Sequence, residues 1–104
     1  MRRVRIFFDW DPRKAETNPA KHGVSFDEAM SVFRDPLAMS IFDEDNSDHE
    51  DRWVTLGETA GARLLLVVHT HVEMTQEEAV LIRIISARAP TSREAAQYRQ
   101  GGSK

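Results

Sequence analysis

The chain has 104 residues, 40% of them hydrophobic and 30% charged, with a net charge of −3, which is typical of a folded globular protein and excludes a wholly disordered one. Two cores would each be too small to hold at this length, so we expect one domain over residues 1–100 and a flexible tail at 101–104. The absence of cysteine excludes disulfides and a cysteine nucleophile, and no apolar run is long enough to span a membrane, so we expect a cytoplasmic protein.

The charges are segregated along the chain. Residues 43–51 contain six carboxylates, whereas residues 82–99 contain four arginines and one acidic residue. A net negative charge by itself argues against nucleic-acid binding, but separate basic and acidic patches are compatible with it. The charge balance therefore leaves the class of partner open.

The N-terminal part predicts a strand and then a helix. Apolar residues alternate over residues 3–8, as in a strand. Asp11-Pro12 is a typical helix start, and Gly23 supplies the left-handed residue that commonly ends one. Pro19 interrupts this span, so we expect it to split or kink the helix, with Asn18 capping the second part.

A second helix is the clearest prediction in the sequence. It begins at a capping box, Ser25 to Glu28, and its apolar residues recur at helical spacing up to Phe33. Asp35-Pro36 ends it.

The remaining sequence predicts four strands and a last helix. The strands are expected at residues 37–42, 53–56, 64–71 and 80–87. The last of these is almost wholly apolar, which is typical of a strand buried on both faces. A polar protruding loop is expected at 72–79, and a second capping box, Thr91 to Glu94, begins the final helix. Helices grouped in this way predict an α+β fold: a largely antiparallel sheet, two N-terminal helices after the first strand and one C-terminal helix.

Several short motifs occur in a characteristic order and spacing. They are Phe8-Asp9-Trp10-Asp11-Pro12, Lys21-His22-Gly23-Val24-Ser25-Phe26, Asp35-Pro36-Leu37, Asp51-Arg52-Trp53, Leu56-Gly57, Leu66-Val67-Val68-His69-Thr70, Arg83-Ile84-Ile85-Ser86-Ala87-Arg88, Arg93-Glu94 and Tyr98. Through them the chain resembles the BrnT toxin family, within the RelE-like ribonuclease toxins, from about Phe7 to Tyr98. Pro19 and the length of the 72–79 segment depart from the family pattern.

The resemblance implies a RelE-like fold and a ribonuclease that inhibits translation. It also implies a partner: a cognate BrnA-like antitoxin that typically binds DNA through a ribbon–helix–helix domain. We expect a heteromeric complex of two toxins with an antitoxin dimer, which contacts operator DNA only through the antitoxin and does not contact membranes. A non-catalytic module of the same fold, which only binds a partner or nucleic acid, is the alternative.

Cleavage of RNA without a metal needs a base, a cation for the phosphate and an acid. Arg83 is the strongest candidate for the cation because it interrupts an apolar strand, where a charge is costly unless it is paired or functional. The alternative is a buried ion pair with Glu28 or Glu94. Arg52, at the start of another strand, is a second candidate, and a surface salt bridge to the acidic run is its alternative.

Arg88 is a third candidate, at the end of the strand that carries Arg83. In a regular strand the two side chains would point to opposite faces, because they are an odd number of residues apart. Arg88 therefore shares the site of Arg83 only if the strand has ended or bulges between them.

Proton transfer has three candidates: His69, His22 and Tyr98. His69 could equally be a hydrogen-bonded structural histidine, and Tyr98 could serve as an acid or as a stacking platform. Lys21 and His22 could contact phosphate, or only complement the dipole of the helix that they end.

His69 and His71 are spaced like a metal-binding pair on one face of a strand. No third ligand is evident, so we expect neither a metal nor another cofactor. For the antitoxin, we expect an acidic segment that covers Arg52 and Arg83; the alternative is a basic segment that binds residues 43–51.

Overall fold

The computed structural model describes residues 4–101 of the chain. Its elements in order are β1 (Arg5–Trp10), α1 (Pro12–His22), α2 (Phe26–Met30), the 3₁₀ turn η1 (Ser31–Arg34), β2 (Met39–Phe42), the 3₁₀ turn η2 (Glu44–Asn46), β3 (Trp53–Glu58), β4 (Leu64–His69), β5 (Val72–Met74), β6 (Ala79–Arg88) and α3 (Ser92–Gly101). The expected strand start at Arg3 and the tail residues 102–104 lie outside the described residues. None of the helices within 4–101 is long and apolar enough to cross a membrane.

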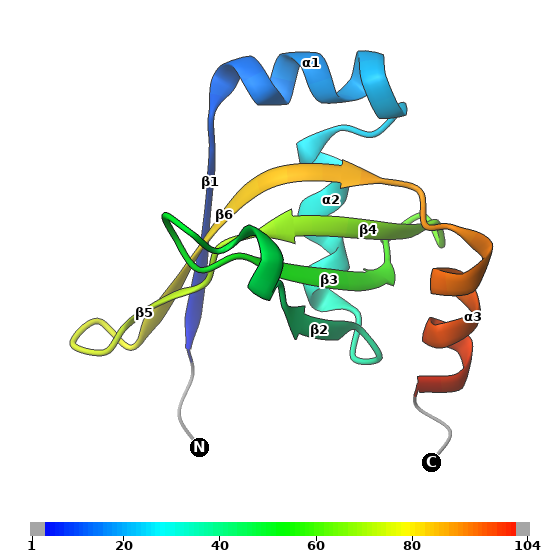
Figure 1. Ribbon diagram of the computed structural model, residues 1–104. Coiled ribbons are helices and arrows are strands. Elements are labelled where there is room, and N and C mark those ends of the chain that lie inside the picture. Colours follow the sequence, from blue (N-terminus) through cyan, green and yellow to red (C-terminus); the bar gives the residue numbers. More distant parts are fainter. Residues whose placement is uncertain (1–3, 102–104) are drawn as a thin grey trace.

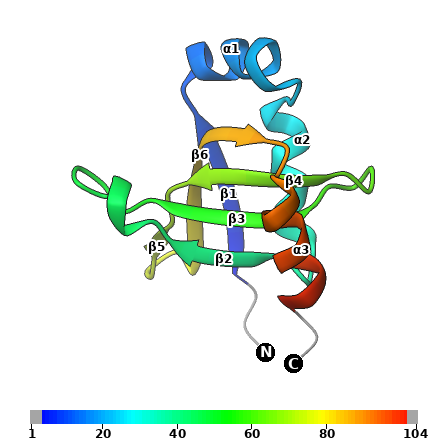
Figure 2. The same cartoon turned by 45° about the vertical axis from the view of Figure 1, so that its right-hand side comes forward.

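The strands form one sheet in the order β1-β6-β4-β3-β2, with β5 paired to the start of β6. Only the β1–β6 pair is parallel; the other described pairs are antiparallel. Figures 1 and 2 show α1 and α2 behind and above the strands, and α3 toward one end of the opposite face. The α+β class, with a largely antiparallel sheet and two helices after the first strand, is confirmed.

The hydrophobic core lies on the face of the sheet that α2 covers. Side chains of β4 and β6 meet the helical segment there, and the buried cluster comprises Val24, Phe26, Ala29, Val32, Leu65, Val67, Ile82, Ile84 and Ala87. The other face is largely open, and we call it the open face. Arg83 is exposed, so the expectation that its strand is buried on both faces is wrong: β6 has one covered face and one open face.

A β-bulge in β6 changes which residues point to the core. Val68 pairs with Ser86 but the next residue of β4, His69, pairs with Ile84, so Ile85 is the extra residue. The buried positions of β6 accordingly step from Ile84 to Ala87. This shift places Arg83 and Arg88 on the same, open face of the sheet.

Helix α1 runs without a break from Pro12 to His22, so the expected split at Pro19 is wrong. Asn18 does not cap a second helix; it is buried, and its side-chain amide donates to the carbonyls of Val24 and Ala87, at 2.8 Å each, and accepts from the Ala87 N–H at 3.2 Å. Asn18 thereby hydrogen-bonds to the edge of β6 at Ala87, beyond Ile84, which is the last residue of β6 that pairs with β1. We infer that these three bonds outweigh the one helical hydrogen bond that proline removes.

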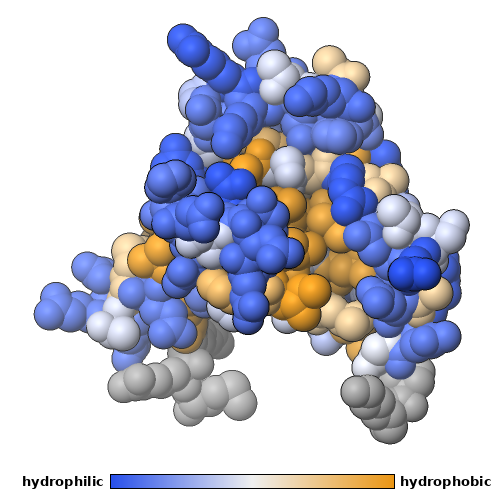
Figure 3. Space-filling view, viewed as in Figure 1, coloured by the Kyte–Doolittle hydropathy of each residue, from blue (hydrophilic) through white to orange (hydrophobic). Residues whose placement is uncertain are grey.

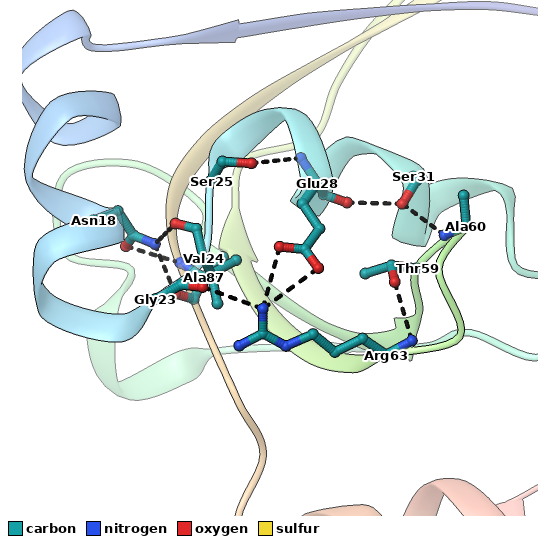
Figure 4. A network of polar contacts seen from close by, with 10 residues as sticks. All are labelled: Asn18, Gly23, Val24, Ser25, Glu28, Ser31, Thr59, Ala60, Arg63 and Ala87. Atoms are coloured by element: carbon teal, nitrogen blue, oxygen red, sulfur yellow. Dashed lines mark hydrogen bonds and ion pairs between the residues drawn. The ribbon is translucent and has the colours of Figure 1, made fainter.

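A polar network ties the two N-terminal helices to the β3–β4 hairpin (Figure 4). The Arg63 guanidinium donates to the Gly23 carbonyl at 3.1 Å and lies 3.3 Å from the Glu28 carboxylate. Ser25 accepts from the Glu28 N–H, as the first capping box predicts, although the Glu28 side chain is turned to Arg63. The second capping box forms in both directions, between Thr91 and Glu94.

The segment at 72–79 differs from the expected loop. Val72–Met74 forms β5, which returns along β6 through a turn at 75–78, so the segment is a β-hairpin. The preceding strand also ends at His69 rather than at residue 71. His69 and His71 therefore do not share one strand face as expected.

Candidate functional site

Arg83 lies in the middle of β6 and borders a hollow of about 290 Å³, which we call the Arg83 hollow. It is lined by Asp9, Glu50, Asp51, Thr70, His71, Val72, Leu81 and Arg83. These residues come from β1, from the end of the β2–β3 loop, from the link after β4 and from β6. The hollow thus brings together a guanidinium, an imidazole and three carboxylates.

Backbone pairing fixes the geometry of this hollow. Asp9 is the register partner of Arg83 across the parallel β1–β6 pair. Thr70 donates its N–H to the Arg83 carbonyl at 2.9 Å, and its hydroxyl accepts from the Arg83 N–H at 3.2 Å. His71 follows directly on this anchored residue, so the chain holds it beside Arg83.

The Arg83 side chain is exposed and makes no ion pair with any residue in 4–101. Glu28 pairs with Arg63 instead, and Glu94 pairs with Arg88. The alternative interpretation of Arg83 as half of a buried ion pair is therefore wrong. An arginine with free donors beside a hollow is able to bind a phosphate with both arms of its fork.

Like Asp51, His71 is a residue of this hollow that was not singled out for proton transfer from the sequence. It is exposed, and its ring lies 6.3 Å from that of Trp53. Its position just after the end of a strand is the only sequence signal, because loops that follow strands often carry functional side chains. The sequence analysis placed it only in a possible metal pair.

His69 points the other way, into the core. It is 2% exposed, and its ring packs edge-on against Phe33 with the centroids 4.8 Å apart. Its Nδ1 lies 2.8 Å from the Thr70 carbonyl, which can only accept, so Nδ1 carries the proton and Nε2 accepts from the Thr55 hydroxyl at 2.6 Å. Burial lowers the pKa of His69, which keeps the ring neutral.

Thr55 in turn lies 2.6 Å from the Ser40 hydroxyl, so a chain of hydrogen bonds links β2, β3 and β4 through His69. Both ring nitrogens are occupied within the protein, and the ring is remote from solvent. The geometry corresponds to the structural histidine that the sequence left as an alternative.

Arg52 stands beside the Arg83 hollow rather than in it. Its guanidinium is 3.9 Å from the Glu50 carboxylate, and Glu50 also lines the hollow. This is the surface contact with the acidic run that the sequence left as an alternative. Arg52 remains about one-third exposed, with a side-chain exposure of 35%, and lines a separate hollow with Asp45, Asp48 and Glu50.

Arg88 shares the open face with Arg83 because of the bulge, but not its hollow. The two are five positions apart, roughly 15 Å along a strand. The Arg88 guanidinium makes two hydrogen bonds to the Glu94 carboxylate, at 2.9 and 3.1 Å. This bond to Arg88 is the main reason why the pKa of Glu94 falls to about 2. The Arg88 side chain therefore binds α3 through Glu94.

Tyr98 is also bound within the protein. Its hydroxyl donates to the Asp35 carboxylate at 2.6 Å, which raises the pKa of Tyr98 to about 12. Burial alone would raise the pKa of Asp35, but hydrogen bonds from Tyr98 and from the N–H groups of Glu58 and Leu37 lower it overall. This contact joins α3 to the turn before β2, away from the Arg83 hollow.

Lys21 and His22 occupy the exposed last turn of α1, before Gly23 with its φ of 69°. Neither lines the Arg83 hollow. Their place matches the interaction with the helix dipole that the sequence gave as an alternative. Within residues 4–101, no group of three or more His, Asp and Glu side chains is arranged to hold a metal ion.

Comparison with known proteins identifies the class of protein that carries this hollow. The family model described as "Ribonuclease toxin, BrnT, of type II toxin-antitoxin system" matches residues 10–94. The chain therefore belongs to the BrnT family of ribonuclease toxins.

A solved structure agrees with this assignment. The 1.1 Å crystal structure of the Brucella abortus ribonuclease toxin BrnT is similar over 86% of this chain and 100% of that one, with 25% sequence identity and a TM-score of 0.57. No curated protein sequence matches the chain.

Proposed function

We propose that this chain is a metal-independent endoribonuclease whose reaction takes place in the Arg83 hollow. The observation that carries the proposal is the meeting there of Arg83, without an ion-pair partner in 4–101, with His71 and with carboxylates. These are the three kinds of group that RNA cleavage needs when no metal takes part: a cation, an acid and a base.

Asp51 is the carboxylate best suited to act as the base. The Asp9 carboxylate accepts the Trp10 N–H at 2.8 Å, and Glu50 is the partner of Arg52, whereas Asp51 makes no hydrogen bond or ion pair with the described residues. Its oxygens are therefore free to accept a proton from substrate.

We propose the following reaction for these groups. Asp51 takes the proton of a ribose 2′-hydroxyl, and the 2′-oxygen attacks the neighbouring phosphorus. Arg83 binds two phosphate oxygens and stabilises the charge that develops on them, with Arg52 as a second cation at the rim. The bond from phosphorus to the 5′-oxygen breaks, and the His71 imidazolium gives that oxygen its proton. The products are a 2′,3′-cyclic phosphate and a 5′-hydroxyl end.

Membership of a toxin–antitoxin family supplies the biological setting of this proposal. Cleavage of RNA used in translation would stop protein synthesis. A cognate BrnA-like antitoxin with a ribbon–helix–helix domain would neutralise the chain in a complex of two toxins with an antitoxin dimer.

The test uses purified chain with a free single-stranded RNA pool, with and without EDTA, and with the same pool in a cell-free translation reaction without EDTA. We expect cleavage in EDTA, products with 2′,3′-cyclic phosphate ends, and no cleavage of the same pool made with 2′-deoxyribose. Intact RNA in every reaction with folded chain would contradict the enzyme and favour a binding module. Activity lost in EDTA and restored by one divalent ion would contradict metal independence.

A further inference from the structure

A second hollow lies on the open face of the sheet, at the Arg88 end of β6. It has a volume of about 350 Å³, and we call it the apolar cleft. Seven apolar side chains from β2, β3 and β4 line it: Met39, Ile41, Phe42, Val54, Leu56, Leu66 and Val68. Figure 3 shows it as an apolar strip between the hydrophilic surfaces of the β2–β3 loop and α3.

The apolar cleft follows from the sequence of β4, which is apolar on both of its faces. Leu65 and Val67 are fully buried toward α2, while Leu66 and Val68 point into the apolar cleft. A sheet with one solvated face normally alternates apolar and polar residues, so this second apolar face needs a cover, which the chain itself supplies at Leu56 and Leu66, each 6% exposed.

Helix α3 covers only part of this face. Its contacts with Arg88 and Asp35 hold it at the rim. Ile41 is 67% exposed and Phe42 41% exposed, on the edge strand β2, whose outer backbone groups have no strand partner within residues 4–101. An exposed apolar edge strand is a surface to which another chain readily pairs.

We infer that the apolar cleft is the docking surface for an amphipathic segment of the antitoxin, with apolar side chains on one face and Lys or Arg at one end. This inference rests on the proposed antitoxin pairing and not on RNA cleavage. We place Lys or Arg at one end of the antitoxin segment because that end would lie beside negative charge. Asp43 lines the cleft and begins the run of six carboxylates at 43–51. Arg88, at the opposite end, is already neutralised by Glu94.

The same charges disfavour the acidic segment expected from the sequence. An acidic segment would meet Asp43 in the apolar cleft, where the Arg88 guanidinium is already paired with Glu94. A second copy of this chain is also disfavoured, because a two-fold dimer through a concave surface would place one hollow against another.

The experiment compares two isoleucine substitutions in the full chain, purified with and without the polypeptide encoded directly beside it. Ile41→Arg puts bulk and positive charge at the mouth of the apolar cleft, where a side chain that is 67% exposed contributes little to folding. Ile6→Arg is the matched control, since Ile6 is 47% exposed on β1 and does not line the cleft. Binding is measured by titration, folding by thermal unfolding and self-association by sedimentation.

We expect Ile41→Arg to weaken binding of the neighbouring polypeptide about 30-fold, the effect of losing one anchor residue, and Ile6→Arg to leave it unchanged. Arg83→Ala should bind like the parent although it no longer cleaves RNA, and Ile41→Arg should cleave like the parent. Normal binding by Ile41→Arg together with weak binding by Arg83→Ala would place the antitoxin on the Arg83 hollow and overturn the inference.

Two further outcomes would also overturn it. A parent chain that sediments as a dimer, and becomes a monomer on Ile41→Arg, would show that a second copy covers the cleft. A parent chain that cleaves RNA but does not bind the neighbouring polypeptide would refute the docking surface and leave the proposed ribonuclease intact.

Discussion

The middle and the C-terminal end of β6 carry one arginine each on the same face of the sheet, and the two arginines differ in whether their guanidinium donors are used. Arg83 has free donors and faces a hollow with an imidazole and carboxylates. Arg88 is bonded twice to Glu94 and helps to fix α3 beside the apolar cleft. An arginine on a sheet is therefore a candidate for catalysis only when the fold leaves its donors unused.

Substitutions in the Arg83 hollow should act mainly on the rate of RNA cleavage. His71→Ala should lower the rate of RNA cleavage about 100-fold or more, because it removes the acid for the leaving oxygen. His69→Gln, two residues away, should cleave at nearly the parent rate per folded molecule, since His69 lies in the core. Single-turnover cleavage, corrected for the folded fraction, measures both. Loss of activity in His69→Gln alone would reverse the assignment of the two histidines.

At the Arg88 end the expected effect is on stability. Asn18→Ala should lower the free energy of unfolding by about 2–4 kcal/mol, because it leaves the N–H and carbonyl of Ala87 without partners in a buried place. Thr17→Ala on the same helix is the control, since Thr17 is exposed and makes one long bond of 3.4 Å. Urea denaturation compares them. Equal loss in both variants would mean that Asn18 does not hold this end of β6.

A smaller effect is expected for the partner of Arg88. Glu94→Gln should destabilise the chain by about 1 kcal/mol, because it weakens a partly exposed ion pair and one capping bond. RNA cleavage should not change. A large loss of cleavage on Glu94→Gln, with little loss of stability, would bring Arg88 back into the catalytic site.

The smallest effect is a pH dependence of stability. The pKa of His69 is lowered from its ordinary 6.5 by burial, so the unfolded chain binds this proton first, and stability should begin to fall as the pH drops below about 6.5. The pKa of Glu94 is lowered from 4.5 to about 2, so a second loss of stability is expected as the pH falls from 4.5 to about 2.

Thermal unfolding between pH 7 and 2 measures both losses. His69→Gln should flatten the upper part of the profile and leave the lower part in place. An unchanged slope between pH 6.5 and 5 in this variant would show that His69 does not titrate in the assumed way.

The sequence predicted what is decided locally. Both capping boxes lie where expected, Gly23 ends α1, and the class of fold is confirmed. These features depend on residues within a few positions of each other, so their spacing is sufficient to predict them.

What the sequence could not predict depends on contacts between distant segments. The passage of α1 through Pro19 depends on bonds from Asn18 to Ala87, 69 residues away. The bulge at Ile85, which puts the two arginines on one face, depends on the pairing of β6 with β4. Without knowledge of this bulge, the sequence could not show that Arg83 and Arg88 lie on the same face of the sheet.

The candidate site was predicted in part for the same reason. Arg83 was singled out because a charge interrupts an apolar run, and it lies in the hollow. His71 was missed because its role depends on where β4 ends and on the bonds between Thr70 and Arg83. Arg88, His69 and Tyr98 carry suitable chemistry, but the structure has bonded each of them to a neighbour.

The most direct test of this account is the cleavage of one RNA by Arg83→Ala and Arg88→Ala, measured beside the stability of each. We expect Arg83→Ala to lose about 100- to 1000-fold in rate, the effect of removing one transition-state donor, with no change in unfolding. Arg88→Ala should lose stability and keep its rate. The reverse pattern, an active Arg83→Ala and a stable but inactive Arg88→Ala, would contradict the account.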